Sequence, residues 1–185
     1  LSIAESGDTI FVDALQLPGG DIVAYGTVTM GPGLPISGLF VRMDSNDGAV
    51  IAQRQYGDGL NNYVIDQIAL MPDGTLTALA RVGSGDAWVA SLNQNGIIQW
   101  QHNLTTDSFL GGSFELVDPA ETESYTTSDV MVFGFKGDVP LPFGAGNLDV
   151  LAAVIDTSGV VNSALQWTNT QGSPGPRVYT DENTG

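Results

Sequence analysis

The sequence repeats a strand-like segment at intervals of 54 residues. The three copies span residues 21–28, 75–82 and 129–136. Each copy has an aromatic residue or Leu at its fifth position, followed by Gly or Ala at its sixth. Because spacing and side-chain size recur together, the chain is predicted to consist of similar structural units, as in propellers, solenoids and other arrays.

The sequence around the second copy predicts four strands joined by tight turns. A Pro-Asp-Gly turn at 72–74 and an Asn-Gln-Asn-Gly turn at 93–96 separate apolar runs. Gly and Asn tolerate the positive φ of such turns, so these sequences are strong hairpin signals. The predicted strands of the three units are 10–17, 21–28, 39–43 and 49–56; 64–71, 75–82, 87–92 and 97–102; and 114–117, 129–136, 148–155 and 160–167.

The pattern predicts an all-β chain, because no stretch has sustained apolar spacing of three and four residues. Four-stranded antiparallel units of this length are the period expected of propeller blades. A β-sandwich is the alternative, although it gives no reason for side-chain size to repeat. We therefore predict a single β-propeller-like domain of about three complete blades plus a partial one. The blades are predicted at 9–57, 58–104 and 109–168, with strands of flanking blades at 1–8 and 177–185.

The two ends of the chain are out of phase with a closed ring. Residues 3–8 read like the end of a fourth strand, and residues 177–185 like a first strand that reaches its turn. A closed propeller pairs strands from both termini in one blade, and here that blade would lack its second and third strands. We expect an open arc that belongs to a longer chain or is completed by other copies through its open edges.

The charge balance excludes several classes of partner. Five scattered basic residues stand against 21 carboxylates, which gives a formal net charge of -16. Nucleic acid and anionic membrane surfaces are therefore unsuitable partners, and no apolar run approaches the ~20 residues of a membrane-spanning helix. The absence of cysteine excludes disulfides and thiolate metal sites. A composition with few Lys and many Asp, Gly and Thr favours a secreted bacterial protein. No leader precedes Leu1, so we expect that a signal peptide has been removed or that the chain is an excerpt.

The second unit resembles a known repeat. After the Pro-Asp-Gly turn and a strand, residues 84–96 read Ser-Gly-Asp-Ala-Trp-Val-Ala-Ser-Leu-Asn-Gln-Asn-Gly, and the next strand contains Trp100. This pattern is similar to the bacterial SBBP and delta-60 type β-propeller repeats, closely over 12–104 and loosely over 114–167. The resemblance implies a secreted or surface-attached propeller, and its structural motifs carry no catalytic residue across.

Two loops are predicted to lie on one rim of the array, where the second and third strands of a blade are joined. Both loops contain Leu-Pro followed by a large apolar residue. The first loop has Leu34 and Ile36, and the second has Leu141 and Phe143. Solvent-facing apolar loops on one rim are typical of a contact surface for a protein or a glycan. The alternative is that the loops fold back and cover the ends of the blades.

The sequence supports metal binding and catalysis less well. Asp44 and Asp47 place oxygen donors for Ca²⁺ at close spacing, but they lack the order of a helix-loop-helix calcium site, and a plain hairpin turn explains them. The acidic stretch 118–123 can likewise be interpreted as Ca²⁺ ligands or as a run of charged residues exposed to solvent. His102 is the only histidine, so a Ser-His-Asp arrangement would depend on it, and an ordinary edge histidine is the simpler interpretation. We predict that the chain is not an enzyme and that it binds no cofactor.

The predicted function is that of a non-catalytic extracellular or cell-surface module for binding, adhesion or protein contact. The alternative is a structural subunit of a self-associating extracellular assembly or filament. A monomer with a ligand on the loop rim would favour the first function. Ordered self-association through residues 1–8 and 177–185 would favour the second.

Overall fold

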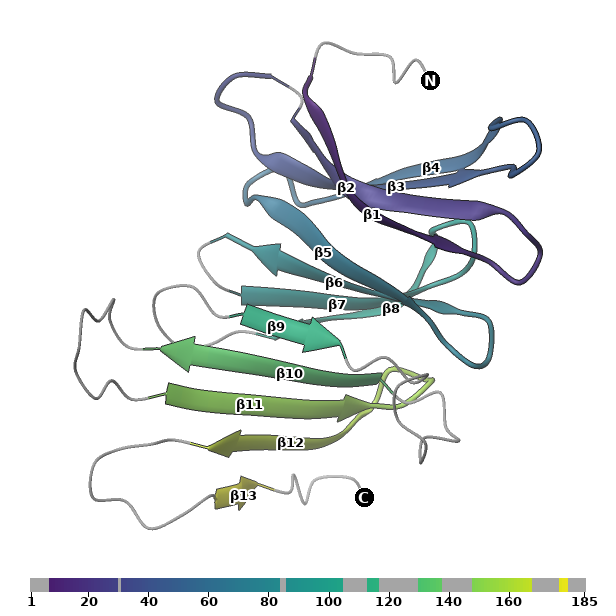
Figure 1. Ribbon diagram of the computed structural model, residues 1–185. Coiled ribbons are helices and arrows are strands. Elements are labelled where there is room, and N and C mark those ends of the chain that lie inside the picture. The colour runs from purple at the N-terminus through teal and green to yellow at the C-terminus, as the bar shows by residue number, and fades with distance from the viewer. Residues whose placement is uncertain are drawn as a thin grey trace.

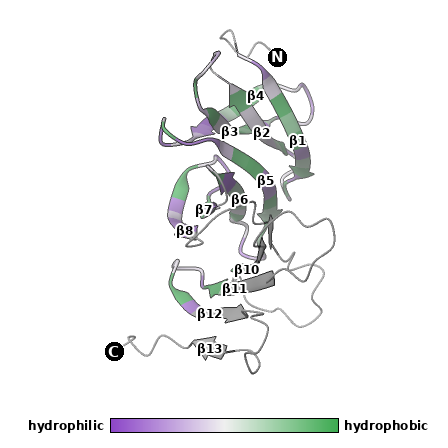
Figure 2. Ribbon diagram, turned by 90° about the vertical axis from the view of Figure 1, so that its left-hand side faces the viewer, coloured by the Kyte–Doolittle hydropathy of each residue, from purple (hydrophilic) through white to green (hydrophobic). Residues whose placement is uncertain are grey.

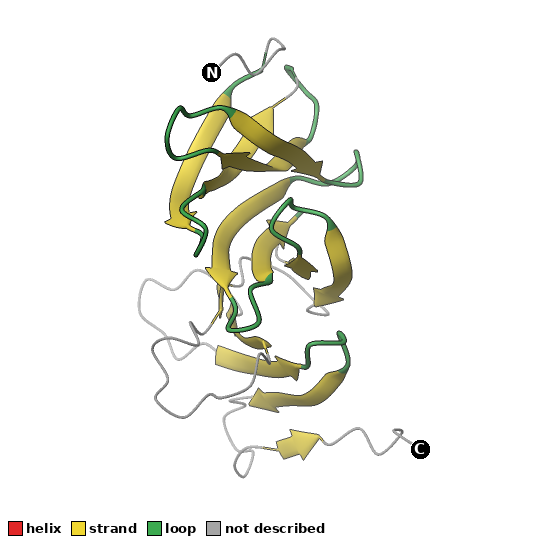
Figure 3. Ribbon diagram, turned by 90° about the vertical axis from the view of Figure 1, so that its right-hand side faces the viewer, coloured by secondary structure: helices red, strands yellow, loops and turns green. Residues whose placement is uncertain are grey.

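The computed structural model describes residues 7–29, 31–83, 86–104, 113–116, 130–137, 148–167 and 177–179. Every regular element in this part of the chain is a β-strand, and Figure 3 shows these strands joined by loops. The same residues therefore include no helix with the length and apolar character needed to cross a membrane. The prediction of an all-β fold is confirmed for the described residues.

The strands form three antiparallel sheets, and the strands of each sheet are paired in the order of the chain. The first two sheets have four strands each and the third has five, and none of these described sheets closes into a barrel. The first sheet contains β1 (Thr9–Gln16), β2 (Ile22–Thr29), β3 (Ile36–Met43) and β4 (Val50–Tyr56). The second contains β5 (Tyr63–Leu70), β6 (Leu76–Val82), β7 (Asp86–Leu92) and β8 (Ile98–Leu104). The third contains β9 (Ser113–Leu116), β10 (Val130–Gly137), β11 (Leu148–Ile155), β12 (Val161–Trp167) and β13 (Arg177–Tyr179).

The three sheets are stacked one on the next (Figure 1). β5 contacts β1, β2 and β3 of the first sheet, while β9 of the third sheet contacts β5 and β6. The second sheet therefore lies between the other two. Each of its faces packs against a different neighbour.

The C-terminal strand differs from the prediction. The sequence suggested that residues 177–185 begin a further blade, but β13 pairs with β12 and becomes the edge strand of the third sheet. The outer side of β12 offers backbone N–H and C=O groups to any strand that passes nearby, which explains this pairing. Residues 1–6, predicted to belong to the other flanking blade, lie outside the described part of the chain.

Apolar side chains fill the interface between the first and second sheets. β5, which contacts three strands of the first sheet, carries a hydrophobic stretch (Figure 2). Burying side chains of Val to Phe size contributes roughly 1.5–3 kcal/mol each, so this interface is a major source of stability. Its larger buried members are Leu17, Val23, Tyr25, Phe40, Tyr56, Tyr63, Ile65, Ile68, Leu76, Val82, Trp88 and Leu92.

A second interface joins the second and third sheets. Consecutive residues of β6 point to opposite faces, as strand geometry requires, so Ala78 and Ala80 pack towards the first sheet while Leu79 packs towards the third. Every residue from Ala87 to Leu92 in β7 is buried for the same reason. The buried members of the second interface are Ala69, Met71, Leu79, Ala87, Val89, Val130, Val132 and Ile155.

Two side chains also tie an outer strand to a turn of the next sheet. Tyr56 of β4 donates a hydrogen bond of 2.7 Å to the carbonyl oxygen of Gly96, between β7 and β8. His102 Nε2 of β8 lies 2.5 Å from the carbonyl oxygen of Gly159, between β11 and β12, so this nitrogen carries the proton that it donates. The two glycines have φ angles of 74° and 87°. A Cβ atom on Gly96 would lie 2.7 Å from the ring of Phe40, and one on Gly159 would lie 2.6 Å from the ring of Trp100. Only glycine therefore fits both the conformation and the space.

A β-bulge lies beside the small residue of the second strand in the first two units. The register of the first strand shifts at Val12 in β1 and at Asp66 in β5, which are again 54 residues apart. The recurring small residues, Gly26 and Ala80, pair immediately beside these bulges. A Cβ atom on Gly26 would overlap the carbonyl oxygen of Ile10. At Gly26 the small residue is therefore required by the close approach of two strands at a bulge.

We predict that Gly26→Ala destabilises the protein by about 1–3 kcal/mol, because the added methyl group must push β1 away from β2. Gly19→Ala is the matched control, since a Cβ atom at Gly19 has no neighbour within 4 Å, and its effect should stay within about 0.5 kcal/mol. Urea unfolding of both variants measures the difference. Equal stability of the two variants would contradict the proposed close approach.

Candidate functional site

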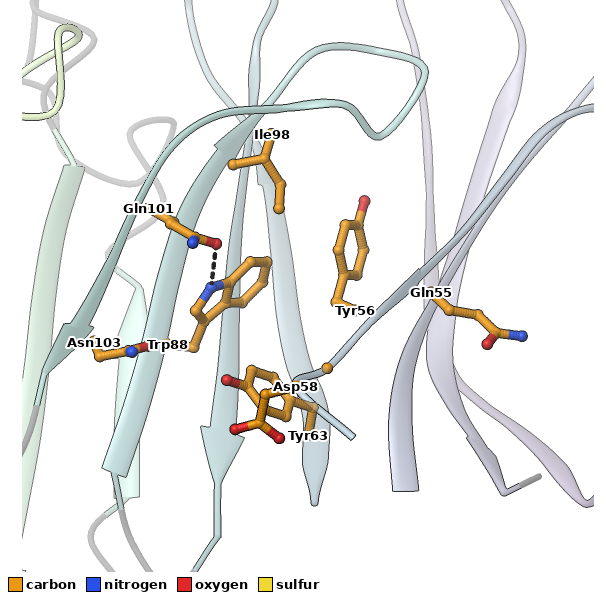
Figure 4. Close-up of a pocket in the computed structure, with 9 residues that line it drawn as sticks. Gln55, Tyr56, Asp58, Tyr63, Trp88, Ile98, Gln101 and Asn103 are labelled. Carbon is orange, nitrogen blue, oxygen red and sulfur yellow. Dashed lines mark hydrogen bonds between the residues drawn. The ribbon is translucent and has the colours of Figure 1, made fainter. Parts of the chain in front are cut away.

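A pocket of about 240 Å³ lies where the first sheet ends and the second begins. Its lining residues come from the end of β4 and the connection after it, and from β5, β7 and β8 of the second sheet (Figure 4). Its volume corresponds to that of roughly eight water molecules at ~30 Å³ each, so a small molecule fits. The lining residues are Gln55, Tyr56, Gly57, Asp58, Tyr63, Trp88, Ile98, Gln101 and Asn103.

Three aromatic residues form the inner part of this Trp88 pocket. The ring of Trp88 lies 5.3 Å from that of Tyr56 and 6.3 Å from that of Tyr63, measured between centroids. All three residues are buried. Burial raises the pKa of both tyrosines, with a smaller contribution from the Asp58 carboxylate at Tyr63. Both phenols are therefore neutral at pH 7, and the inner wall is uncharged and tightly packed.

Two amide side chains of β8 stand beside the indole. Trp88 Nε1 donates a hydrogen bond of 3.0 Å to Oε1 of Gln101, so the amide nitrogen of Gln101 points away from the ring (Figure 4). Asn103 pairs with Trp88 across β7 and β8, which places both on the same face of the sheet. Gln101 and Asn103 are exposed to solvent. The pocket therefore offers hydrogen-bonding groups at its opening.

Asp58 adds a negative charge at the entrance. Its carboxylate accepts three hydrogen bonds of 2.8 Å, from the backbone N–H groups of Asn61 and Leu60 and from the side-chain amide of Asn61. These bonds, led by the one from the Asn61 backbone, hold the pKa of Asp58 below its usual value of about 3.9. No Lys, Arg or His is present among the residues that line the pocket. The described part of the site is therefore negatively charged at neutral pH.

Trp88 departs from the repeat. In each sheet the register between the third and fourth strands shifts once, and Trp88 lies four residues before the shifted residue Leu92. The residues at the same position in the other two sheets are Leu39 in β3 and Leu151 in β11. A leucine therefore satisfies the architecture at this register position in two of the three sheets. The indole N–H and its bond to Gln101 belong to the second sheet alone.

The structure describes two of the four residues predicted for the contact rim. Leu34 is 55% exposed, and the backbone N–H of Ile36 donates a hydrogen bond of 2.9 Å to Oδ1 of Asn62. Asn62 belongs to the same connection between β4 and β5 as the pocket residue Asp58, so the loop with Leu34 is attached to the connection that forms the pocket entrance. Leu141 and Phe143 lie outside the described residues, and the contact surface stays a prediction.

The proposed calcium donors lie in the turn between β3 and β4. Asp44 accepts a hydrogen bond of 2.7 Å from the backbone N–H of Asn46, and Asp47 one of 2.9 Å from that of Ala49. These are the bonds of a hairpin turn. Within the described ranges, no three His, Cys, Asp or Glu side chains come together as metal ligands. The stretch 118–123 falls outside those ranges.

His102 has a structural partner. It is half-buried, its ring lies 5.7 Å from that of Trp100, and its Nε2 atom contacts the Gly159 carbonyl. Trp100 donates a hydrogen bond of 3.1 Å to the carbonyl oxygen of Thr157 in the same turn. Both rings thus help to hold the third sheet against the second, in keeping with the simpler interpretation of this histidine.

The Trp88 pocket could not be located from the sequence. Tyr56, Tyr63 and Trp88 come from three different strands, and nothing in the linear sequence shows that they meet. One signal was present: aligning the third strands of the three units places Trp88 against two leucines.

Comparison of the chain with models of protein families found no match, and a search of curated proteins found none either. The likeness to SBBP and delta-60 type repeats therefore rests on the residues of the second unit.

We predict that the Asp58 carboxyl group titrates below pH ~3.9, because its ionised form accepts three hydrogen bonds in the folded state. Since the folded pKa is lowered, this contribution to stability is present above the unfolded pKa and is lost as pH falls through the folded pKa. An NMR titration of the carboxyl carbon measures the value. Asn61→Ala removes one donor and should raise it, whereas a midpoint at or above pH ~3.9 in the unsubstituted protein would contradict the prediction.

Proposed function

We propose that this chain is a non-catalytic binding module that acts outside the cell or on its surface and contacts a protein or a glycan. The observation that carries the proposal is the Trp88 pocket, which occupies the one sheet where an indole replaces the leucine of the other two. A concave site with an apolar wall and a few placed polar groups is the usual form of a ligand site. Exposed Leu34, on a loop tied to the pocket entrance, supports a wider contact surface.

We also propose that the sheets are blades of a propeller-like arc. Three observations support this arrangement: the sequential strand order within each sheet, the bulges 54 residues apart, and the contact of β5 with three strands of the preceding sheet. A β-sandwich is the alternative, and its Greek-key connections would bring strands from distant parts of the chain into one sheet. The resemblance to SBBP and delta-60 type repeats and the composition support a secreted bacterial protein.

A binding panel tests the proposed function. The immobilised chain is exposed to extracellular proteins and to cell-surface glycans, and binding is measured by interferometry. We expect at least one member to bind, and Trp88→Leu to weaken that binding by about 10-fold or more, because truncating an aromatic anchor at the centre of a site typically costs over 1 kcal/mol. Trp88→Leu keeps the residue type that the other sheets use.

Two further variants control this experiment. Asn103→Ala changes an exposed pocket residue and tests the site even if Trp88→Leu unfolds. Val160→Ser changes a residue that is 46% exposed in the turn between β11 and β12, outside the pocket, and should bind like the unsubstituted chain. The proposal is wrong if no panel member binds, or if the pocket variants bind as tightly as the Val160 variant.

A structural subunit of a self-associating assembly is the second candidate function. β1 is an edge strand and exposes three consecutive apolar residues, with Ile10 63%, Phe11 43% and Val12 51% exposed. A sheet edge with apolar side chains is a template for pairing with another chain. This observation favours association through the first sheet.

We predict that, if this second function holds, light scattering shows dimers or larger species that Val12→Lys abolishes, because a charged residue on an edge strand opposes pairing. Val160→Lys places the same charge on an exposed residue of the turn between β11 and β12 and should leave association unchanged. A monomer at every concentration tested would argue against an assembly subunit, and would leave the binding function intact.

A further inference from the structure

We infer that the Trp88 pocket binds a neutral sugar unit of a glycan. This inference rests on the proposed binding function and names its ligand class. The pocket has a volume of about 240 Å³, which suits one small polar molecule better than a folded protein segment. The identity of its ligand follows from the groups that line it.

The hydrogen-bonding groups of the pocket match hydroxyl groups. A hydroxyl both donates and accepts, and so do the amides of Gln101 and Asn103 and the phenol of Tyr63, all of which line the pocket. The carboxylate of Asp58 adds a strong acceptor at the entrance. A molecule that carries several hydroxyl groups in a small volume can use all of these at once.

The apolar groups of the pocket match the other face of a sugar. Trp88 and Ile98 line the same space as the amides, so the wall is partly aromatic and partly aliphatic. The C–H groups of a sugar ring form an apolar patch that can pack against Ile98, which is 38% exposed, and against the part of the Trp88 indole that lines the pocket. The hydroxyls at the edge of the ring then reach the polar groups. Figure 4 shows the amides of Gln101 and Asn103 beside the indole rather than opposite it.

The charge of the site excludes acidic ligands. Asp58 is ionised, no basic residue lines the pocket, and the chain has a formal net charge of -16. A phosphate, sulfate or uronate group would be repelled and would find no cation to pair with. Acidic glycans are therefore poor ligands.

The packing of the aromatic rings argues against an organic cation. A cage for an ammonium group needs ring faces that surround an open space. Here Trp88 packs against Tyr56 and Tyr63, and all three side chains are buried, so the three rings pack together and do not surround an open space. The amides at the opening would also find no hydrogen-bonding partner on a quaternary ammonium group. A neutral, hydroxyl-rich ligand uses the whole lining.

The site is also held in place before a ligand arrives. The bond from Trp88 to Gln101, the bond from Tyr56 to Gly96 and the three bonds to Asp58 all form within the protein. Side chains that are already ordered lose less entropy on binding. A preformed polar site of this kind suits a sugar, whose weak individual contacts cannot order a mobile pocket.

The experiment is an NMR titration of the chain with neutral oligosaccharides of glucose, galactose, mannose and N-acetylglucosamine. Oligogalacturonate serves as the anionic probe and choline as the cationic probe. At least one neutral oligosaccharide should shift the indole N–H signal of Trp88 saturably, while the indole signal of Trp100, outside the pocket, stays in place. Asn103→Ala should weaken this binding by about 10-fold, because it removes hydrogen bonds to a ligand hydroxyl.

Three results would overturn the inference. The first is that choline or oligogalacturonate shifts the Trp88 signal more strongly than every neutral oligosaccharide. The second is that neutral oligosaccharides bind but Trp88→Leu and Asn103→Ala leave their affinity unchanged. The third is that no neutral oligosaccharide binds although a protein in the panel does so through Trp88, in which case the binding function stands and the ligand class is wrong.

Discussion

The first two sheets of this protein carry apolar side chains on both faces, so their stability depends on what packs against those faces. In β7 every residue from Ala87 to Leu92 is buried, and consecutive strand residues face opposite ways. The second sheet therefore needs the first sheet on one side and the third on the other. On its far face the first sheet repeats the pattern, with a small buried cluster of Val28, Leu39 and Val41. Stacking removes from water the apolar side chains on the sides where neighbouring sheets face each other.

The features that recur along the chain serve this stacking. The bulges at Val12 and Asp66 recur at the interval of the sequence repeat, and the glycines at 96 and 159 let a turn fit against the aromatic residues of the preceding sheet. Trp88 is different, because leucines take its place in the other two sheets. A repeat maintains what packing requires, and a departure from the repeat indicates a local role. The pocket beside Trp88 is where such a role is best supported.

Much of the fold could be predicted from the sequence, because its signals are local. Apolar runs and turns rich in Gly, Asn and Asp located the strands, including residues 148–155, which match β11 in both bounds. The pocket could not be predicted, since Tyr56, Trp88 and Gln101 meet only after two sheets have packed together. The pairing of β13 with β12 was missed for a related reason. A three-residue strand carries little pattern of its own, and its partner is chosen by which edge lies within reach.

The sequence alone determined that this chain is built from repeated antiparallel strands, that its turns fall where Gly, Asn and Asp occur, and that its charge disfavours acidic partners. These properties depend on residues close together in the chain or on totals over the whole of it. The tertiary structure decided which faces meet, why a small residue must stand at Gly26, and that an indole, two amides and a carboxylate share one opening. Those outcomes depend on distances between strands of different sheets, which twist and packing set and which no local pattern records.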